Sequence, residues 1–208
     1  MKIFFIVLAA LVTVFCIAQL IIMKTTNNTE MYPYKILKKY DDFEIRKYDA
    51  ANFSYVTMKT NSYQESSGQG FKSLAGYIFG GNEKNESIAM TSPVVVNLSD
   101  TITMQFMLPS NYKLSDLPTP NNPNVKFKTE KEKFVATVSF GGWSNDEKIK
   151  QHISKLNDLL KENGIKHFNN FSYFGYNPPF QMVNRRNEIS VEIDINSLNG
   201  SGIKAENN

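Results

Sequence analysis

The chain has 208 residues, of which 41% are hydrophobic and 21% charged, and its formal net charge is only +3. This composition is typical of a globular protein with one domain, and the interspersed charges lack the basic stripe of a nucleic-acid-binding surface. The single cysteine, Cys16, lies in an apolar N-terminal run. The rest of the chain therefore has no disulfide, no cysteine metal site and no thiol nucleophile.

The N-terminal segment, residues 3–23, is almost continuously apolar and is interrupted only by Thr13 and Gln19. A helix of this length rises about 30 Å, the thickness of a bilayer core. Its exit lacks the small residues of a cleavage site, so we predict an uncleaved membrane anchor over residues 1–24 and a linker at 25–30. A slight charge bias places the N-terminus inside and the domain on the extracytoplasmic side. The alternative is a cleaved signal peptide, which would release a secreted or periplasmic domain.

The predicted domain covers residues 31–198, and the polar residues 199–208 form a predicted tail. In the first half of the domain, four segments show the alternation or the β-branched content of strands: residues 43–48, 52–59, 93–98 and 102–108. The last two are joined by a Ser99-Asp100 turn.

A helix is predicted between the second and third of these strands. It begins at a capping box, in which Ser62 accepts a backbone hydrogen bond and Glu65 reaches back. It ends at the pair Gly80-Gly81. Three internal glycines weaken this helix by about 1 kcal/mol each relative to alanine, so it needs tertiary support and lets a partner approach its backbone. They are Gly68, Gly70 and Gly76.

The second half repeats this order after a loop rich in proline and asparagine at residues 110–124. Its predicted strands are residues 125–129, 133–140, 170–176 and 188–195. A second capping box begins at Ser144, an apolar stripe follows at helical spacing, and Gly164 ends this second helix. We therefore predict a pseudo-duplicated α+β domain, in which two α-helices pack on a distorted antiparallel β-barrel or curved sheet.

Side chains that commonly carry catalysis are scarce. The sequence has no serine elbow, P-loop or zinc-ligand spacing, so we predict neither an enzyme nor a metal site. His152 falls beside the apolar stripe of the second helix, where a histidine at the edge of the core is commoner than a ligand. His167 lies in the loop that follows and is predicted to be exposed.

Two other features have a structural and a functional interpretation. Met90 is either a soft thioether ligand or part of the core. The pair Arg185-Arg186 suits a planar carboxylate, or else forms an internal ion pair with Glu188. Because neighbouring strand residues point to opposite faces, at most one of the two arginines faces any given pocket.

Several short segments together resemble the SOUL/heme-binding-protein family, over about residues 34–195. In chain order they are FEIRKY at 43–48, FKSLAGYIFGGN at 71–82, IAMTSPV at 88–94, FMLP at 106–109, FGGW at 140–143, YNPPF at 176–180 and RRNEI at 185–189. The chain looks like a bacterial-type member with an N-terminal membrane anchor. The resemblance implies a distorted antiparallel barrel with two helices, built from a duplicated unit.

The resemblance also implies a function, namely non-catalytic binding of heme or a related tetrapyrrole in an apolar groove beside the first domain helix. The residues that it assigns to this groove are Leu74, Tyr77, Ile78, Phe79 and Met90, with Arg185 or Arg186 facing the propionates. No histidine here matches the iron-ligating position proposed for some members, and Gly76 replaces a basic residue of some relatives. The resemblance therefore favours binding of the ring, without a clear axial ligand. The alternative is a membrane-tethered, heme-independent module that binds another apolar small molecule or a protein partner.

Overall fold

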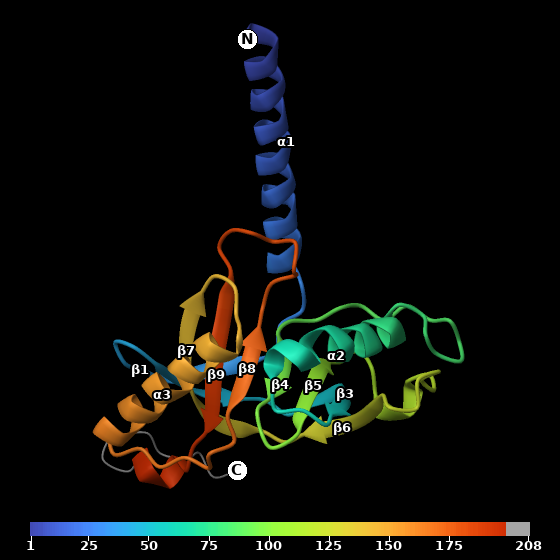
Figure 1. Ribbon diagram of the computed structural model, residues 1–208. Helices are drawn as coiled ribbons and strands as arrows, with labels where there is room; N and C mark the ends of the chain where they lie inside the picture. The colour runs from blue at the N-terminus through green and yellow to red at the C-terminus, as the bar shows by residue number, and fades with distance from the viewer. Residues whose placement is uncertain (199–208) are drawn as a thin grey trace.

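The computed structural model describes residues 1–198, and Figure 1 shows a long N-terminal helix standing out from a domain of strands and helices. Within these residues the helices are α1 (Lys2–Asn27), α2 (Tyr63–Ile78) and α3 (Asp146–Glu162). The strands are β1 (Tyr34–Lys39), β2 (Glu44–Tyr48), β3 (Ala51–Met58), β4 (Val94–Asn97), β5 (Ile102–Met107), β6 (Lys126–Glu130), β7 (Lys133–Gly141), β8 (Ser172–Gly175) and β9 (Arg186–Glu192). Two short 3-10 turns, Leu114–Asp116 and Ile195–Leu198, complete the described elements.

Helix α1 is long and apolar enough to cross a membrane. Its segment Lys2–Thr26 has a mean hydropathy of 2.8, and a signal sequence at the same place would have the same character. The helix extends to Asn27, three residues beyond the predicted end of the anchor at residue 24. Its side chains are largely exposed, but Gln19 is buried against the domain.

The domain is a single nine-stranded antiparallel sheet in the order β1-β2-β7-β9-β8-β4-β5-β3-β6. Strands β2 to β5 belong to the first half of the chain, and β6 to β9 belong to the second. The third strands of the two halves, β4 and β8, pair at the centre. The first strand of each half is exchanged, so that β2 pairs with β7 and β6 pairs with β3. This symmetry confirms the predicted duplicated α+β fold with a curved sheet.

Most predicted elements are present, with two corrections. Strand β1 was not predicted; it pairs with β2 at the edge of the sheet and has a register shift between Ile36 and Lys38. The α3 cap is Asn145, whose side chain accepts from the backbone N–H of Lys148, so the capping box predicted at Ser144 is wrong by one residue. The predicted tail, residues 199–208, lies outside the described residues.

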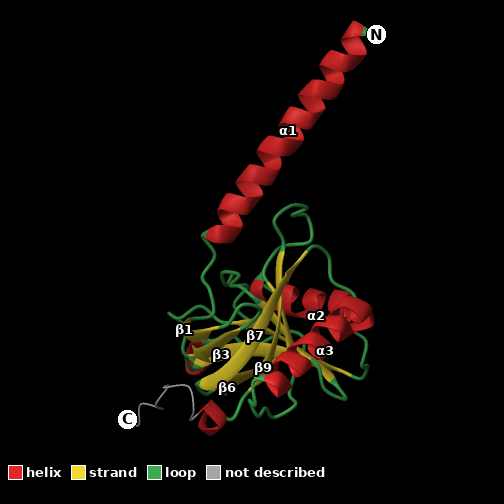
Figure 2. Cartoon of the chain, turned by 90° about the vertical axis from the view of Figure 1, so that its left-hand side faces the viewer, coloured by secondary structure: helices red, strands yellow, loops and turns green. Residues whose placement is uncertain are grey.

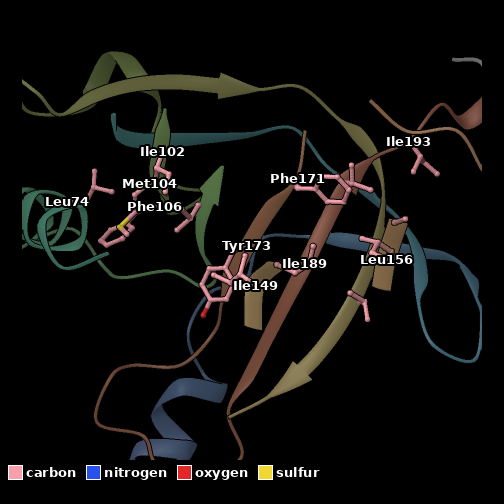
Figure 3. Close-up of a cluster of buried hydrophobic side chains, with 14 of the residues drawn as sticks. Leu74, Ile102, Met104, Phe106, Ile149, Leu156, Phe171, Tyr173, Ile189 and Ile193 are labelled. Carbon is pink, nitrogen blue, oxygen red and sulfur yellow. The ribbon is translucent and has the colours of Figure 1, made fainter. Parts of the chain in front are cut away.

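Helices α2 and α3 lie together on one side of the sheet, as Figure 2 shows. Between these helices and the sheet lies the main core, part of which is drawn in Figure 3. The approach of α2 is close: a Cβ added at Gly70 would meet the Met58 sulfur at 2.8 Å and the Met104 Cβ at 3.3 Å. Glycine at this position therefore allows α2 to lie directly on β3 and β5.

A second, mostly aromatic cluster of buried side chains fills the other face of the sheet. Tyr32 and Tyr48 lie with ring centroids 4.5 Å apart, and Tyr32 meets the edge of Phe53 at 5.2 Å. The remaining members are Val95, Met107, Val135, Phe174 and Tyr176. The many aromatic residues of the sequence are thus largely used in two cores, which restricts the candidates for a ligand surface.

Candidate functional site

The residues that the sequence assigns to a groove come from three parts of the fold. Four belong to the C-terminal end of α2, Met90 lies in the connection to β4, and the two arginines lie where β9 begins. The α2 residues are Leu74, Tyr77, Ile78 and Phe79. The structure therefore gathers only the four α2 residues on one element, and it engages the two arginines in contacts within the protein.

Three of the four α2 residues are core residues. Leu74, Tyr77 and Ile78 are 0%, 1% and 2% exposed. Figure 3 shows Leu74 pointing from α2 toward Met104 and Phe106 of β5. These side chains lie beneath the outer face of α2, so they can support a ligand surface without forming its outermost layer.

The hydroxyl of Tyr77 is also occupied by a contact within the protein. It donates a hydrogen bond to the Pro118 carbonyl oxygen at 3.1 Å. Burial, together with the nearby Glu86 and Tyr112, raises the pKa of Tyr77 to about 12. Tyr77 is therefore a neutral phenol at physiological pH and does not offer a phenolate to a metal.

The outward face of α2 carries an open surface. Phe79, the C-cap residue, is 68% exposed, and a Cβ added at Gly68 or Gly76 would have nothing within 4 Å. Lys72 is exposed and lies between the two glycines at helical spacing. We call Gly68, Lys72, Gly76 and Phe79 the α2 surface. It combines an apolar ring, bare helix backbone and one cation.

The other end of α2 is closed by a contact from the second half of the chain. Asp146, in the first turn of α3, accepts hydrogen bonds from the Ser62 hydroxyl at 2.7 Å and from the backbone N–H of Tyr63 at 2.6 Å. The Ser62 hydroxyl accepts in turn from the Glu65 N–H, as predicted. The predicted contact of the Glu65 carboxylate with the Ser62 N–H is wrong, because both groups bind the Thr60 hydroxyl instead. Because these donors already have a carboxylate partner, the N-terminus of α2 is not an open anion site.

Met90 is half-buried and packs against the main core. The next residue, Thr91, ties this connection to β5, because its hydroxyl donates to the Met107 carbonyl oxygen at 2.6 Å. Met90 was interpreted either as a thioether ligand or as part of the core, and its contacts in the structure are those of a residue that packs against the core.

The guanidinium of Arg185 donates hydrogen bonds to backbone carbonyl groups of the loop that precedes it. Its Nη1 donates to the oxygens of Pro178 at 2.8 Å and Gln181 at 2.7 Å, and its Nη2 donates to Asn177 at 3.4 Å. The same group stacks on Trp143, 4.1 Å from the ring centroid. Arg185 is therefore a residue that shapes this loop.

Arg186 forms the internal ion pair that was one of its two interpretations. Its Nη2 donates to Glu188 Oε1 at 2.7 Å, and its guanidinium lies 4.1 Å from the ring centroid of Tyr176. Glu188 is fully buried and also binds the buried Arg46, at 2.8 and 3.1 Å. Two further donors to the carboxylate are the hydroxyls of Tyr176 at 2.7 Å and Ser139 at 3.1 Å. We call these five residues the Glu188 cluster.

The charge state of this cluster follows from its contacts. Burial opposes ionisation of Glu188. The hydrogen bonds and charge of Arg46, the charge of Arg186 and the hydrogen bond of Tyr176 nevertheless hold the pKa of Glu188 below its usual value. Burial is likewise the largest influence on Tyr176, whose pKa is raised well above its usual value. The Glu188 carboxylate is therefore ionised and stabilises the fold through its hydrogen bonds. The surrounding donors already bind this carboxylate and do not point to a ligand site.

The two histidines lie away from the α2 surface in sequence. The Nδ1 of His152 lies 2.8 Å from the Lys148 carbonyl oxygen, and its ring stacks on Phe140 with centroids 3.9 Å apart. His167 Nε2 lies 3.0 Å from Asn157 Oδ1. Both side chains thus have partners on or beside α3, which agrees with the core-edge interpretation of His152.

Two hollows on the domain do not involve the predicted residues. A shallow one of about 510 Å³ lies over the polar outer side of α3, between Gln151 and Glu162. A second, of about 260 Å³, opens beside the ends of β4, β7, β8 and β9 and includes Phe171 and Phe174. A ligand on the α2 surface would therefore contact an open face of the protein.

One exposed apolar group was missed by the sequence interpretation. In the loop between β8 and β9, Phe180, Met182 and Val183 are exposed. Arg185 of the same loop stacks on Trp143, which is also exposed. The signal was the apolar composition of PPFQMV at residues 178–183, of which only PPF was interpreted, as part of a family motif.

Comparisons with known proteins agree on one family. A family model described as SOUL heme-binding protein matches residues 29–192. Heme-binding protein 2 of Mus musculus is 32% identical over 157 residues, which cover 71% of this chain and 76% of that protein. Heme-binding protein 1 of Xenopus laevis is 27% identical over 155 residues, which cover 71% and 81%.

Among solved structures, the C-terminal domain of EcmrR has a TM-score of 0.57 at 10% identity, covering 77% of this chain and 98% of that one. A hydrolase from Listeria innocua has a TM-score of 0.54, also at 10% identity, covering 76% and 94%. At this level of identity the likeness concerns the fold alone.

Proposed function

Because the chain belongs to the SOUL heme-binding protein family, we propose that it binds heme or a related tetrapyrrole without catalysing a reaction. The observation that carries this proposal is the family match itself, which spans α2, α3 and both halves of the sheet. The relatives named above are called heme-binding proteins, and they align over most of their own length. The chain's own surface is consistent with a flat apolar ligand.

The α2 surface has the chemistry that a porphyrin needs. A porphyrin has a large flat apolar face, which favours an exposed aromatic ring such as Phe79 and close approach to helix backbone at Gly76. Its two carboxylates favour a cation, and Lys72 lies on the same side of the helix. Leu74, Tyr77 and Ile78 form the packed layer beneath, and Met90 lies in the following connection. In this proposal Arg185 and Arg186 act indirectly, because both guanidinium groups already form hydrogen bonds within the protein.

The proposed contact is with the ring rather than with the iron. Residues 63–92, which contain α2 and the connection to β4, include neither histidine nor cysteine. Tyr77 is a hydrogen-bonded neutral phenol. Methionine sulfur at residue 90 is packed against the core. Bound heme would supply its own redox-active iron, and the protein's contribution would be to hold the ring against α2.

The test is a titration of the full chain in lipid nanodiscs with heme and with metal-free protoporphyrin IX. Empty nanodiscs are the control, because both compounds partition into lipid. We expect a saturable Soret shift with heme and a saturable fluorescence change with protoporphyrin IX, with dissociation constants within about tenfold of each other. A folded protein that shows no saturable change with either compound would end the proposal. Binding of heme alone would instead assign the affinity to an iron ligand.

We also propose that α1 is retained as a membrane anchor, with the domain on the extracytoplasmic side. The apolar helix is long enough to span, and Lys2 and the amino group precede it. Protease added to intact cells or spheroplasts should digest the domain and leave a small membrane-bound fragment. Complete protection of the domain would contradict the assigned side, and a mature chain that begins after residue 24 would contradict retention.

A further inference from the structure

The loop of residues 177–185 joins β8 to β9, and we call it the β8–β9 loop. Figure 1 shows it rising from the sheet to the domain-side end of α1. Three of its exposed side chains are apolar: Phe180 is 61% exposed, Met182 57% and Val183 49%. Three exposed apolar side chains within residues 180–183 form an unusual surface for a domain surrounded only by water.

The loop is attached to α1 by Gln19, which with Thr13 interrupts the apolar run of residues 3–23. Gln19 donates from Nε2 to the Phe180 carbonyl oxygen at 3.3 Å, and its Oε1 accepts from the Met182 N–H at 3.0 Å. Gln19 is only 7% exposed. An amide inside a membrane-spanning helix is costly unless its donor and acceptor are both satisfied, and here the loop backbone satisfies both.

A second contact lies seven residues, or about two turns, further along the helix toward the domain. The Thr26 hydroxyl donates to Gln181 Oε1 at 3.1 Å, and Gln181 Nε2 donates back to the Val183 carbonyl oxygen at 3.0 Å. Within the loop, Arg185 donates hydrogen bonds to the carbonyl oxygens of Pro178 and Gln181. These contacts bind the backbone carbonyl groups of residues 178, 180, 181 and 183 and the N–H of residue 182, while the apolar side chains of the loop are exposed.

The depth of this contact follows from helix geometry. Gln19 precedes Lys24, the first charge after the apolar run, by five residues, which corresponds to about 7–8 Å along the helix axis. Side chains of amphipathic segments that lie in a bilayer interface are buried to about 5–10 Å. The β8–β9 loop contains no acidic residue, and its one charge is the cation Arg185. Its position and its charge both suit the boundary between headgroups and acyl chains.

We propose that the β8–β9 loop inserts Phe180, Met182 and Val183 into the lipid interface beside α1. The domain would then be attached to the bilayer at two points, the helix and the loop, and would lie on the membrane surface in a fixed orientation. This inference rests on the proposed anchoring by α1, so its test must report on the anchor and on the loop separately.

Site-specific fluorophores on the full chain in liposomes provide such a test. The native Cys16, labelled with an environment-sensitive dye, reports on the anchor. In a Cys16→Ser background, Phe180→Cys and Met182→Cys report on the loop. Phe168→Cys is the matched control: Phe168 is also 61% exposed, but it belongs to the segment between α3 and β8. Figure 1 shows this segment at the end of the domain away from α1. Quenching is measured with nitroxide-labelled lipids, placed shallow or deep in the bilayer.

The expected result is strong quenching of the Cys16 probe by deep nitroxides, strong quenching of the probes at residues 180 and 182 by shallow ones, and little quenching at residue 168. If the probes at 180 and 182 are quenched no more than the probe at 168 while Cys16 is quenched, the loop proposal is overturned and the anchor stands. An unquenched Cys16 probe would overturn the anchor and the loop together. A blue-shifted but unquenched probe at 180 would show a protein or ligand covering the loop, which also overturns the lipid assignment.

Discussion

Replacing Glu188 with alanine is expected to lower the free energy of unfolding by about 3–5 kcal/mol, because it removes the buried carboxylate that Arg46 and Arg186 share. Arg46 then keeps only Glu44, whose side chain is 19% exposed, as a counter-ion. Arg46 is 2% exposed and loses both of its hydrogen bonds to the Glu188 carboxylate. The hydroxyl of Tyr176, which is also buried, loses its acceptor. The change is measured by urea denaturation of the full chain in mild detergent, followed by circular dichroism.

Asp42→Ala is the matched control for this substitution. Asp42 also forms an ion pair, with Lys155 at 2.6 Å, but both side chains are about half exposed. Exposed pairs of this kind contribute about 0–1 kcal/mol. Similar losses in the two variants would mean that the Glu188 cluster is hydrated and that its charges are screened, contrary to the structure.

The same carboxylate gives the protein an acid-sensitive component of stability. The folded-state pKa of Glu188 lies below its ordinary value of 4.5, so its contribution is complete above pH 4.5 and is lost as the pH falls through the folded-state pKa. Other carboxylates, including Glu130, also have a lowered pKa, so the wild-type curve alone does not isolate Glu188. The difference in the free energy of unfolding between wild type and Glu188→Gln isolates the contribution of Glu188. This difference should shrink on acidification below pH 4.5.

The fold was predictable because its main signals are local. Period-two alternation in β9 separates its apolar face from its polar face, both of which are buried. The apolar stripe of α3 identifies the face that this helix buries, and Gly80 and Gly164 end the two domain helices at positive φ. Strand β1 lacks such a signal. It is an edge strand whose bulge between Ile36 and Lys38 breaks the alternation, and its lysines are typical of a protected edge.

The candidate site was less predictable, for a physical reason. Helical spacing groups Leu74 and Ile78 with their neighbours, but the same apolar residues suit a ligand groove and a core equally well. Only the sheet beneath α2 decides between them. For Arg185 the decisive partners are carbonyl groups of the β8–β9 loop, which side-chain types in the sequence do not reveal.

Leu74→Ala is expected to lower the free energy of unfolding by about 2–5 kcal/mol, the usual cost of truncating a fully buried leucine. Leu74 is 0% exposed and lies against Met104 and Phe106 (Figure 3). Phe79→Ala, on the same helix end, removes a larger side chain that is 68% exposed, so its stability change should stay within about 0.5 kcal/mol. Thermal unfolding of the two variants in the same nanodiscs gives the comparison.

Tetrapyrrole binding should respond to these two variants in the opposite order. If the ring lies on the α2 surface, Phe79→Ala weakens protoporphyrin binding in the nanodisc titration, whereas Leu74→Ala leaves the affinity of the folded fraction nearly unchanged. Measuring below the unfolding transition of Leu74→Ala separates lost affinity from lost fold. A Leu74→Ala protein that stays folded but loses binding, beside an unaffected Phe79→Ala, would mean that α2 opens to admit the ring into the core. The ligand would then contact Leu74, Tyr77 and Ile78 directly, and the open-surface proposal would be wrong.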